Sequence, residues 1–394
     1  MMELPISMPQ APEWQIDWGQ LQLVMEDWFE AMRQTPQNPV HHGEGDVLKH
    51  TRLVCEKLAA MEEFRHLPED RRQLLFTAAL LHDIGKIRTT RKDQNGITSP
   101  NHAAAGARMA REHLWTSWGM AGTMEKMRFR ETVCQLIRLH GKPPFFWELA
   151  ASDNTHGQGW TSMHLHSMAS HACLMPVFSL RLLALLAKAD CLGKICLDQE
   201  EILASIETFS ESAQSLNCYD APPSFADDYS RYAYLSGKTF SPDFKLFDPT
   251  WGTVTVLCGL PGTGKDTWIH RNLPGLPMLS LDEIRRQLKI RPGASQGKVV
   301  QTGYEKAKEL LRRKTPFVWN ATNVRAETRM ELVSLFINYG AAVRIVYLET
   351  SPDEQCRRNH SRQAAVPGGV VERMLGNLEP PRISEAHQVE WICT

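Results

Sequence analysis

Six histidine and aspartate residues lie in the first half of the chain, where predicted helices begin, end or turn. Two of them are adjacent in the segment LLHDIGK, where a turning chain can present both side chains to one cleft. Imidazole and carboxylate groups together suit first-row transition metals, and a bridging carboxylate can hold two ions roughly 3.5–4 Å apart. Such a pair would generate hydroxide and hold a phosphoryl oxygen. The six residues are His50, His82, Asp83, His102, His140 and Asp190.

A glycine-rich segment in the second half, GLPGTGKD, has the spacing of a phosphate-binding loop between a strand and a helix. Its backbone N–H groups and the helix N-terminus attract phosphate, and Lys265 can reach the β- and γ-phosphates of ATP. The usual Ser or Thr after this lysine is Asp266, whose carboxylate could hold Mg²⁺ but adds negative charge. The predicted ATP-binding residues of the loop are Gly259, Leu260, Pro261, Gly262, Thr263, Gly264, Lys265, Asp266 and Thr267.

Four residues downstream of this loop suit phosphoryl transfer. Asp282 follows a short predicted strand and could accept the proton of an attacking hydroxyl, and Arg285, one helical turn later, could hold a substrate phosphate. Arg358 and Arg362 are four residues apart on one predicted helix face, where they could clamp the transferring phosphoryl group. Two alternatives remain: Asp282 could cap a helix, and the two arginines could form a solvated basic face.

The composition excludes several classes of protein. At roughly 150 residues per domain, 394 residues indicate two or three domains. With 42% hydrophobic and 23% charged residues, the chain is typical of a soluble globular protein. It has no run of ~18 apolar residues and no secretory leader pattern, and its nine cysteines include no CxxC pair. We therefore expect a cytoplasmic protein with no membrane span and no disulfide framework.

Charge is divided unevenly, although the formal total is only −1. From Trp251 onward there are 20 basic and 14 acidic residues, whereas the preceding part has 24 basic and 31 acidic residues. Such asymmetry hints at nucleotide or nucleic-acid binding at one end. The near-neutral total favours an enzyme that grips a few terminal phosphates over one that wraps a long duplex.

Apolar residues at three- and four-residue steps predict an all-α first half. We expect a long loop or an irregular insertion over about 141–175, because this segment is rich in Gly, Pro, Ser, His and Trp, and a connector over 218–249. The resulting domains are 1–235, a linker at 236–250, and 251–394. The predicted helices are Trp18–Met32, Val47–Met61, Glu69–Leu81, His102–Leu114, Met127–Leu139, Phe178–Leu192 and Asp198–Ser215.

The second half alternates short β-branched or aromatic runs with helical segments. Strands are predicted at TVTVLCG, at Phe317–Trp319 and at Val343–Leu348, and helices over Lys298–Arg313 and Arg325–Tyr339. This alternation favours a parallel sheet in a three-layer α/β domain. The expected fold class is therefore multidomain, with an all-α bundle followed by an α/β domain.

The order His, His-Asp, His, His, Asp resembles the HD phosphohydrolase superfamily over about Gly43–Lys194. EGDVLKHT also resembles the HD domain attached to bacterial transfer-RNA nucleotidyltransferases. The resemblance implies one or two ions of Mn, Ni, Co, Fe or Zn, with Asp83 bridging. It places one ion on His50, His82, Asp83 and Asp190, and the second on His102 and His140. By its spacing, Lys86 would face the site and neutralise a phosphate, as a catalytic residue alongside His82 and Asp83.

From Thr253 to about Trp391 the chain resembles the 5′-polynucleotide kinase family, with its P-loop, D-x-x-R and R-x-x-x-R order. The resemblance implies ATP with Mg²⁺ or Mn²⁺ as cofactor. It makes Lys265 a ligand of the ATP phosphates, Asp282 the general base on a 5′-OH and Arg285 a contact to the acceptor phosphate. Arg358 and Arg362 would be lid residues that also bind ATP. The family often has Asp at the position of Asn320.

The two halves together resemble the bacterial HD-domain polynucleotide kinases, which heal nucleic-acid ends. That resemblance implies a 5′-OH kinase and a phosphoesterase that removes 2′,3′-cyclic phosphate, 2′-phosphate or 3′-phosphate. Its substrates would be RNA or DNA ends and a nucleoside triphosphate, with a nucleic-acid ligase acting downstream. Two alternatives stay open: a nucleotide phosphohydrolase with a small-molecule kinase attached, or one with an ATP-sensing regulatory domain.

Overall fold

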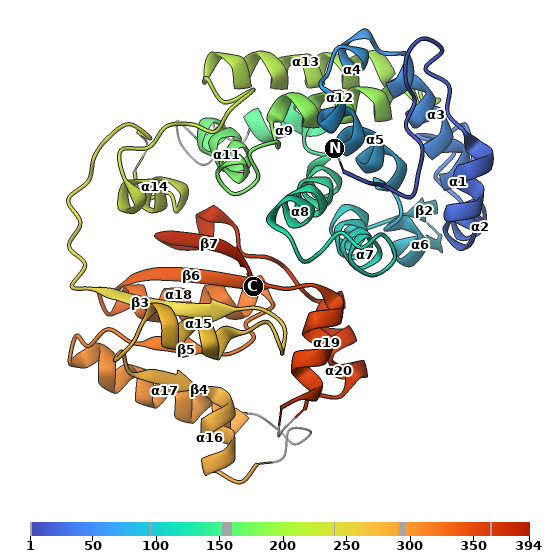
Figure 1. Ribbon diagram of the computed structural model, residues 1–394. Coiled ribbons are helices and arrows are strands. Elements are labelled where there is room, and N and C mark those ends of the chain that lie inside the picture. The colour runs from blue at the N-terminus through green and yellow to red at the C-terminus, as the bar shows by residue number, and fades with distance from the viewer. Residues whose placement is uncertain (1, 95, 152–159, 240, 291–296, 363–364) are drawn as a thin grey trace. The chain divides into compact units, whose positions relative to one another are not determined.

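A computed structural model describes residues 2–94, 96–151, 160–239, 241–290, 297–362 and 365–394 (Figure 1). Contacts between Cα atoms divide the chain into two compact units. The first unit comprises Met1–Met120 and Glu125–Pro223, and the second comprises Ala121–Met124 and Ser224–Thr394. None of the described helices has the length and apolar character needed to cross a membrane.

The first unit is helical, as predicted, apart from one short antiparallel hairpin of β1 (Arg91–Asp93) and β2 (Gly96–Thr98). Its two 3-10 helices are η1 (Pro143–Phe145) and η2 (Ser170–Cys173). Its α-helices are α1 (Trp18–Val24), α2 (Glu26–Arg33), α3 (Val47–Ala60), α4 (Glu62–Arg65), α5 (Glu69–Leu81), α6 (Lys86–Thr89), α7 (His102–Thr116), α8 (Met124–Leu139), α9 (Phe146–Ala151), α11 (Trp160–Ala169), α12 (Leu180–Leu192) and α13 (Gln199–Ser215).

Helix α12 is at the centre of this unit and packs against α3, α5 and α13. Ten of its thirteen residues are buried, as is the whole of Gln73–Leu81 in α5, so these two helices carry apolar residues on every side. The Ser179 hydroxyl accepts the Leu182 N–H and starts α12, and the Asp46 carboxylate accepts the Lys49 N–H and starts α3. The ends of these helices hold the polar residues described below.

Two expectations for the first unit are wrong in part. The predicted helix Trp18–Met32 is interrupted at Met25, where the backbone leaves the helical region. The predicted loop at 141–175 contains η1, α9, α11 and η2, because apolar residues such as Phe146 and Leu165 are buried and hold these turns against the bundle. Residues 152–159 of that segment lie outside the described residues.

The second unit contains a five-stranded sheet with the order β4-β5-β3-β6-β7, and every strand pair is parallel. The α/β fold with a parallel sheet is thus confirmed, whereas the last strand, β7, was not expected. The strands are β3 (Thr253–Cys258), β4 (Met278–Ser280), β5 (Val318–Asn320), β6 (Ala342–Glu349) and β7 (Gln388–Cys393). The helices are α14 (Asp228–Leu235), α15 (Lys265–Asn272), α16 (Leu281–Gln287), α17 (Gly297–Arg312), α18 (Ala326–Asn338), α19 (Pro352–His360), α20 (Gly368–Gly376) and the 3-10 helix η3 (Ile383–Glu385).

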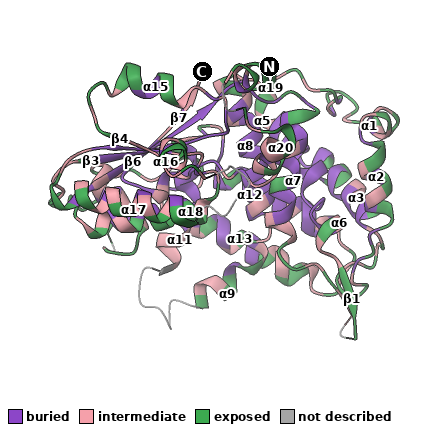
Figure 2. Cartoon of the chain, turned by 90° about the horizontal axis from the view of Figure 1, so that it is seen from below, coloured by how far each residue is buried: buried purple, intermediate pink, exposed green. Residues whose placement is uncertain are grey.

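The central strand β3 is buried from Val254 to Cys258, because strands on both sides and helices cover it. Figure 2 shows the contrast between these buried strands and the partly exposed face of α17, whose buried residues recur at Val299, Gly303, Ala307 and Leu311. This four-residue spacing presents one face of α17 to the core. The carboxyl ends of the parallel strands therefore share one edge of the sheet, and the loops of that edge are the candidate binding loops.

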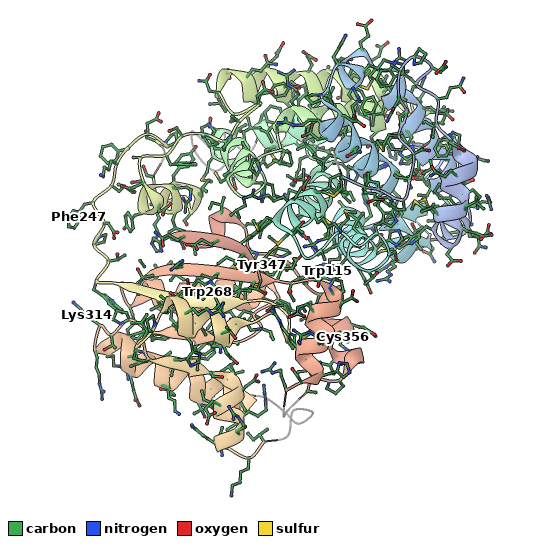
Figure 3. All side chains as sticks on the ribbon, viewed as in Figure 1. Trp115, Phe247, Trp268, Lys314, Tyr347 and Cys356 are labelled. Carbon is green, nitrogen blue, oxygen red and sulfur yellow. The ribbon has the colours of Figure 1, made fainter. Side chains whose placement is uncertain are left out.

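The connector expected over 218–249 is wrong in part, because it contains helix α14, which belongs by its contacts to the second unit. The Tyr229 and Tyr232 rings lie against His387, with ring centroids 5.6 and 4.5 Å away, and the Arg231 guanidinium donates to the His387 carbonyl. His387 in turn accepts the Val343 N–H at Nδ1, 3.1 Å away. After α14 the chain runs to β3 with exposed residues such as Phe247, which points away from the ribbon in Figure 3. The boundaries expected at 235 and 250 stay a prediction.

We predict that a fragment of residues 224–394 is more stable than a fragment of residues 237–394. Loss of α14 exposes His387 and removes the buried Tyr234 side chain, which costs about 2–3 kcal/mol for a large buried side chain. For a unit of this size the midpoint of thermal unfolding would fall by about 5–10 °C. Circular dichroism of the two fragments measures it, and equal midpoints would show that α14 does not stabilise the second unit.

Candidate metal and phosphate-binding sites

The six His and Asp residues of the first unit converge from five helices. His50 lies within α3, His82 and Asp83 follow α5, His102 begins α7, His140 follows α8, and Asp190 lies near the end of α12. The close approach of α7 depends on Gly85, since a Cβ there would lie 2.0 Å from the His102 carbonyl oxygen. The glycine of LLHDIGK is therefore what lets His102 reach Asp83.

One group of three ligand atoms comes from His50, His82 and Asp190. The His50 Nε2 lies 3.0 Å from Asp190 Oδ1 and 3.3 Å from the His82 Nε2. The distance from His82 Nε2 to Asp190 Oδ1 is 3.7 Å. All three side chains are buried, and their atoms are close enough to hold one metal ion.

A second group comes from Asp83, His102 and His140. The Nε2 atoms of the two histidines are 3.3 Å apart, and Asp83 Oδ1 lies 3.5 Å from the first and 4.0 Å from the second. The other oxygen of Asp83, Oδ2, lies 3.4 Å from His82 Nε2 and 3.6 Å from His50 Nε2. The Asp83 carboxylate thus has one oxygen toward each group, which is the bridging arrangement that the resemblance implies.

Backbone carbonyls orient three of the imidazole rings with Nε2 toward the site. His82, His102 and His140 each hold Nδ1 against a backbone carbonyl, of Ala79, Ser99 and Ile137 respectively, at 2.7–2.9 Å. A carbonyl only accepts, so Nδ1 donates, and Nε2 of a neutral ring carries the lone pair that a metal ion needs. The Nε2 atoms of His102 and His140 face each other at 3.3 Å beside Asp83 Oδ1, a buried oxygen without a hydrogen-bond donor, so a cation would fit among these three atoms.

Burial and neighbouring charged groups shift the pKa values of His140, Asp83 and Asp190. Burial and the neighbouring His82 lower the pKa of His140 to about 3, so this ring is neutral. Burial would raise the pKa of Asp83, but Lys86 and His82 outweigh it and hold the value well below the usual range. Lys194 and His50 do the same for Asp190. The neutral ring of His140 and the ionised carboxylates of Asp83 and Asp190 are in the states that a metal ion requires of its ligands.

Two lysines neutralise the outer sides of these carboxylates. The Lys86 Nζ lies 2.7 Å from Asp83 Oδ2, and it also donates to Gln37 Oε1 at 2.6 Å and lies 3.4 Å from His42 Nε2. Its three hydrogens are therefore occupied, and its expected contact with a substrate phosphate stays a prediction. Lys194, which the motif reading did not single out, donates to Asp190 Oδ2 at 2.9 Å from one helical turn away.

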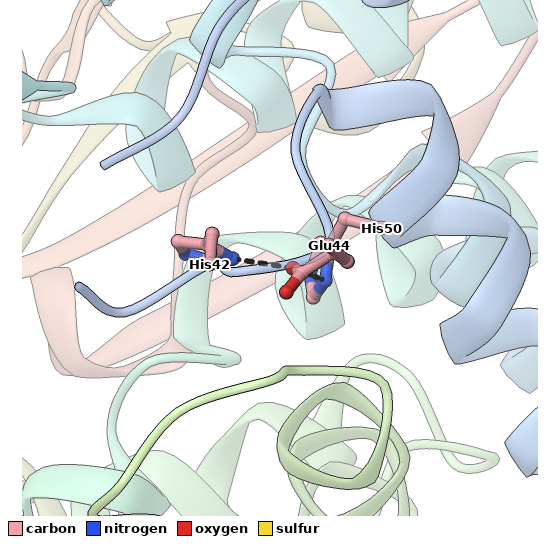
Figure 4. Close-up of side chains that lie close together, drawn as sticks. All are labelled: His42, Glu44 and His50. Carbon is pink, nitrogen blue, oxygen red and sulfur yellow. Dashed lines mark hydrogen bonds and ion pairs between the residues drawn. The ribbon is translucent and has the colours of Figure 1, made fainter. Parts of the chain in front are cut away.

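Glu44 is a further site residue that the sequence reasoning missed (Figure 4). One oxygen, Oε1, lies 2.8 Å from the Nδ1 atoms of both His42 and His50, and the other accepts the Ile195 N–H at 2.9 Å. The carboxylate therefore orients the His50 ring so that Nε2 faces Asp190. Its only sequence signal is the EGD triplet six residues before His50, and no spacing rule for metal ligands selects it.

We predict that Glu44→Gln weakens metal binding by about 10–100-fold, the usual effect of losing the carboxylate partner of a histidine ligand. The amide has one accepting oxygen for three donors and places its own N–H₂ against one of them. Calorimetric titration of Ni²⁺ into metal-free protein measures the affinity. Glu56→Gln, at an exposed position on α3, is the matched control, and an unchanged affinity for Glu44→Gln would contradict the positioning role.

The predicted phosphate loop runs from Gly259 to Gly264, between β3 and α15. Gly259 has φ +144°, and a Cβ there would lie 2.4 Å from the Leu348 carbonyl oxygen, so only a glycine fits at the first position of the loop. The Lys265 Nζ donates to the Gly259 and Leu260 carbonyls at 2.9 Å each. Burial lowers the pKa of this lysine to about 8 although Asp266 raises it, and its ammonium lies in the concavity of the loop.

Helix α15 is anchored so that its N-terminus faces the loop. Trp268 and Ile269 are buried against the sheet with Leu257, Val318 and Val346. The Arg344 guanidinium lies 5.6 Å from the centroid of the Trp268 ring, which Figure 3 labels on α15. The first turn of α15 is thereby held rigidly against the carboxyl end of β3, the arrangement that binds phosphate in P-loop proteins.

Asp266 and Asn320 are neighbours, although 54 residues separate them. The Asn320 Nδ2 lies 2.6 Å from Asp266 Oδ1. Asn320 is the last residue of β5, the strand beside β3, and Asp266 is the second residue of α15. The residue that departs from the P-loop pattern therefore contacts the position where the kinase family often has Asp.

Three of the downstream residues form one charged group. Asp282 pairs with Arg285 within α16, and its Oδ2 lies 3.6 Å from an Arg362 nitrogen. Asp282 is exposed, so its carboxylate can meet a substrate. The alternative that Asp282 caps this helix is wrong, because the Ser280 hydroxyl accepts the Glu283 N–H at the cap position.

Arg358 lies at the phosphate loop instead of in that group. A Cβ on Gly264 would lie 3.2 Å from an Arg358 nitrogen, and the same nitrogen donates to the Thr394 hydroxyl at 3.0 Å. The Thr394 hydroxyl donates in turn to the Thr263 carbonyl of the loop, 3.0 Å away. The expectation that the two arginines share one helix face is wrong, because α19 ends at His360 and Arg362 lies beyond it, so they reach different partners. No sequence signal indicated Thr394.

Comparison with protein families gives two matches, one in each part of the chain. Residues 46–170 match the model of the HD domain, and residues 254–381 match a model of the AAA domain. The chain therefore combines an N-terminal HD domain with a C-terminal P-loop domain of a kinase-like type, which supports a two-activity nucleotide-modifying enzyme. HD domains bind metal ions, and the His/Asp groups described above could hold one or two. Asp190, Lys194 and Glu44 lie outside the matched range.

Proposed function

We propose that this chain heals nucleic-acid ends: it phosphorylates 5′-OH ends with ATP and removes 2′,3′-cyclic phosphate, 2′-phosphate or 3′-phosphate from the opposite ends. The observation that carries the proposal is the presence of two sites in one chain. One is the His/Asp site around Asp83, and the other is a P-loop domain in which an exposed carboxylate, Asp282, lies between two arginines. RNA or DNA ends with a 5′-OH and a 2′,3′-cyclic phosphate need both reactions before a ligase can seal them.

In the proposed kinase reaction, Lys265 and the N–H groups of the loop hold the β- and γ-phosphates, and bound Mg²⁺ or Mn²⁺ neutralises their charge. Asp282 accepts the proton of the 5′-hydroxyl as that oxygen attacks the γ-phosphorus, the bond from this phosphorus to the β–γ bridging oxygen breaks, and ADP leaves. Its pairing with Arg285 and Arg362 places two guanidinium groups where an acceptor phosphate and the transferring phosphoryl group would lie. Arg358, at the loop, contacts ATP.

In the proposed phosphoesterase reaction, His50, His82, Asp83 and Asp190 would hold one transition-metal ion, and His102 and His140 together with Asp83 would hold a second. Such ions would supply a hydroxide nucleophile and a Lewis acid for the phosphoryl oxygen. The carbonyl partners of His82, His102 and His140 orient each ring so that Nε2 faces the site. Lys86 holds Asp83 in place and offers positive charge to the substrate phosphate.

We predict that Asp282→Asn lowers the rate of phosphate transfer by about 10²–10⁴-fold, because the amide cannot accept the hydroxyl proton. Transfer of labelled γ-phosphate from ATP to a short 5′-OH oligonucleotide, with Mg²⁺ present, measures the rate. The matched control is Asp353→Asn, at an exposed position in the first turn of α19. Full transfer by Asp282→Asn would refute its role as base, and absence of transfer by the unaltered protein would refute the kinase proposal.

For the esterase, we predict that a 2′,3′-cyclic phosphate end is opened and dephosphorylated only when Mn²⁺, Ni²⁺ or Co²⁺ is added, and that a chelator stops the reaction. His82→Ala combined with Asp83→Ala removes ligands of both ions and should abolish the reaction while leaving the kinase rate unchanged. The control combines His66→Ala with Asp70→Ala, an exposed pair of the same residue types. Activity that survives loss of His82 and Asp83 would place the esterase elsewhere in the protein.

A further inference from the structure

We propose that Asp266 and Asn320 together form the Mg²⁺-binding pair of the P-loop, as an exchanged version of the usual hydroxyl and carboxylate. This inference rests on the proposed binding of ATP at that loop. In P-loop enzymes a Ser or Thr after the lysine and an Asp on the strand beside the P-loop strand hold the ion. Here the carboxylate, Asp266, follows the lysine, and an amide, Asn320, ends the neighbouring strand β5.

The two departures are in contact and conserve the charge of the pair. Hydroxyl with carboxylate carries one negative charge, and carboxylate with amide also carries one. Mg²⁺ is commonly bound by one or two carboxylates together with substrate phosphates, so one carboxylate in either position is sufficient. The distance of 2.6 Å between Asn320 Nδ2 and Asp266 Oδ1 shows that both side chains reach the same point.

The two side chains differ in exposure. Asn320 is buried, and its side chain lies at the end of the strand. Asp266 is exposed on the first turn of α15, where a nucleotide phosphate would arrive. A carboxylate at a helix N-terminus is also favoured by the helix dipole, which lowers the cost of the added negative charge beside the phosphates. Lys265, next to it, keeps its ammonium in the loop.

The amide can serve an ion by turning over. In the absence of a cation, the N–H₂ group of Asn320 faces the carboxylate, because that end donates. Besides Asp266, its Nδ2 contacts the Met278 sulfur at 3.6 Å, and a thioether is a weak acceptor. A half-turn of the amide exchanges the donor for the carbonyl oxygen, and amide oxygen and carboxylate are both ligands suited to Mg²⁺.

The test measures how much Mg²⁺ tightens the binding of the ATP analogue AMP-PNP, by calorimetry of the full chain with Mg²⁺ or with EDTA. We expect Asp266→Ser alone to lose about tenfold or more of the Mg²⁺ effect, and Asp266→Ser with Asn320→Asp, which restores the usual pair, to regain it to within about threefold. Asp353→Ser, the same change at the second residue of α19, should behave as the unaltered protein.

The outcomes separate this inference from the proposed function. An Mg²⁺ effect unchanged by Asp266→Ser, or no recovery when Asn320→Asp is added, would overturn the exchanged pair while leaving ATP binding intact. Failure of the unaltered protein to bind AMP-PNP under both conditions would overturn the proposed function as well. Thermal unfolding of each variant shows that it is folded.

Discussion

The packing of the helices in the first unit depends on two buried carboxylates, those of Asp83 and Asp190. An ionised carboxylate buried without a partner costs several kcal/mol, so each must face positive charge. Lys86 meets Asp83 Oδ2 and Lys194 meets Asp190 Oδ2, and the two carboxylates also face four imidazole rings. Helices α5, α7, α8 and α12 begin or end near this point and His50 lies in the first turn of α3, so the polar groups of five elements meet close to helix ends.

The helix ends also determine the state of the imidazoles. The carbonyls of Ala79 and Ile137 lie in the last turns of α5 and α8, where no further N–H of the helix reaches them. Each accepts the Nδ1–H of a histidine just beyond its helix, so backbone groups that would lack a partner instead orient His82 and His140. The same contacts satisfy the backbone and turn Nε2 toward the site, which connects folding directly to metal binding.

In the second unit the site has to bind an anion instead of a cation. Its loop, with Lys265 and the helix N-terminus, presents positive potential to an anion, and Arg358 and Arg362 add to it from α19 and the residues after it. The excess of acidic residues before Trp251 and of basic residues after it agrees with one unit that collects cations and another that holds phosphates. The charge division along the chain thus has a local cause in each unit.

The sequence by itself determined the elements with strong periodicity or punctuation: the helices that carry His50, Asp83 and Asp190, the parallel sheet, and the phosphate loop with its lysine. Periodicity is a local signal, so it succeeds where one face of a segment is buried throughout. The same logic failed at 141–175, where Gly, Pro and His suggest a loop but buried Phe146 and Leu165 impose helices, and it did not indicate β7.

Only the tertiary structure decided which polar groups meet. Glu44 between His42 and His50, Lys194 on Asp190, and Asn320 on Asp266 are pairs set by the packing of separate helices and strands, and two of the three carry no recognised motif. Residue type and spacing along a chain state what a side chain can do, whereas the distance across 54 residues from Asp266 to Asn320 depends on how β5 lies beside β3. Where a site needs two groups at one point, the sequence therefore supplies the residue types, and only the fold determines which residues meet.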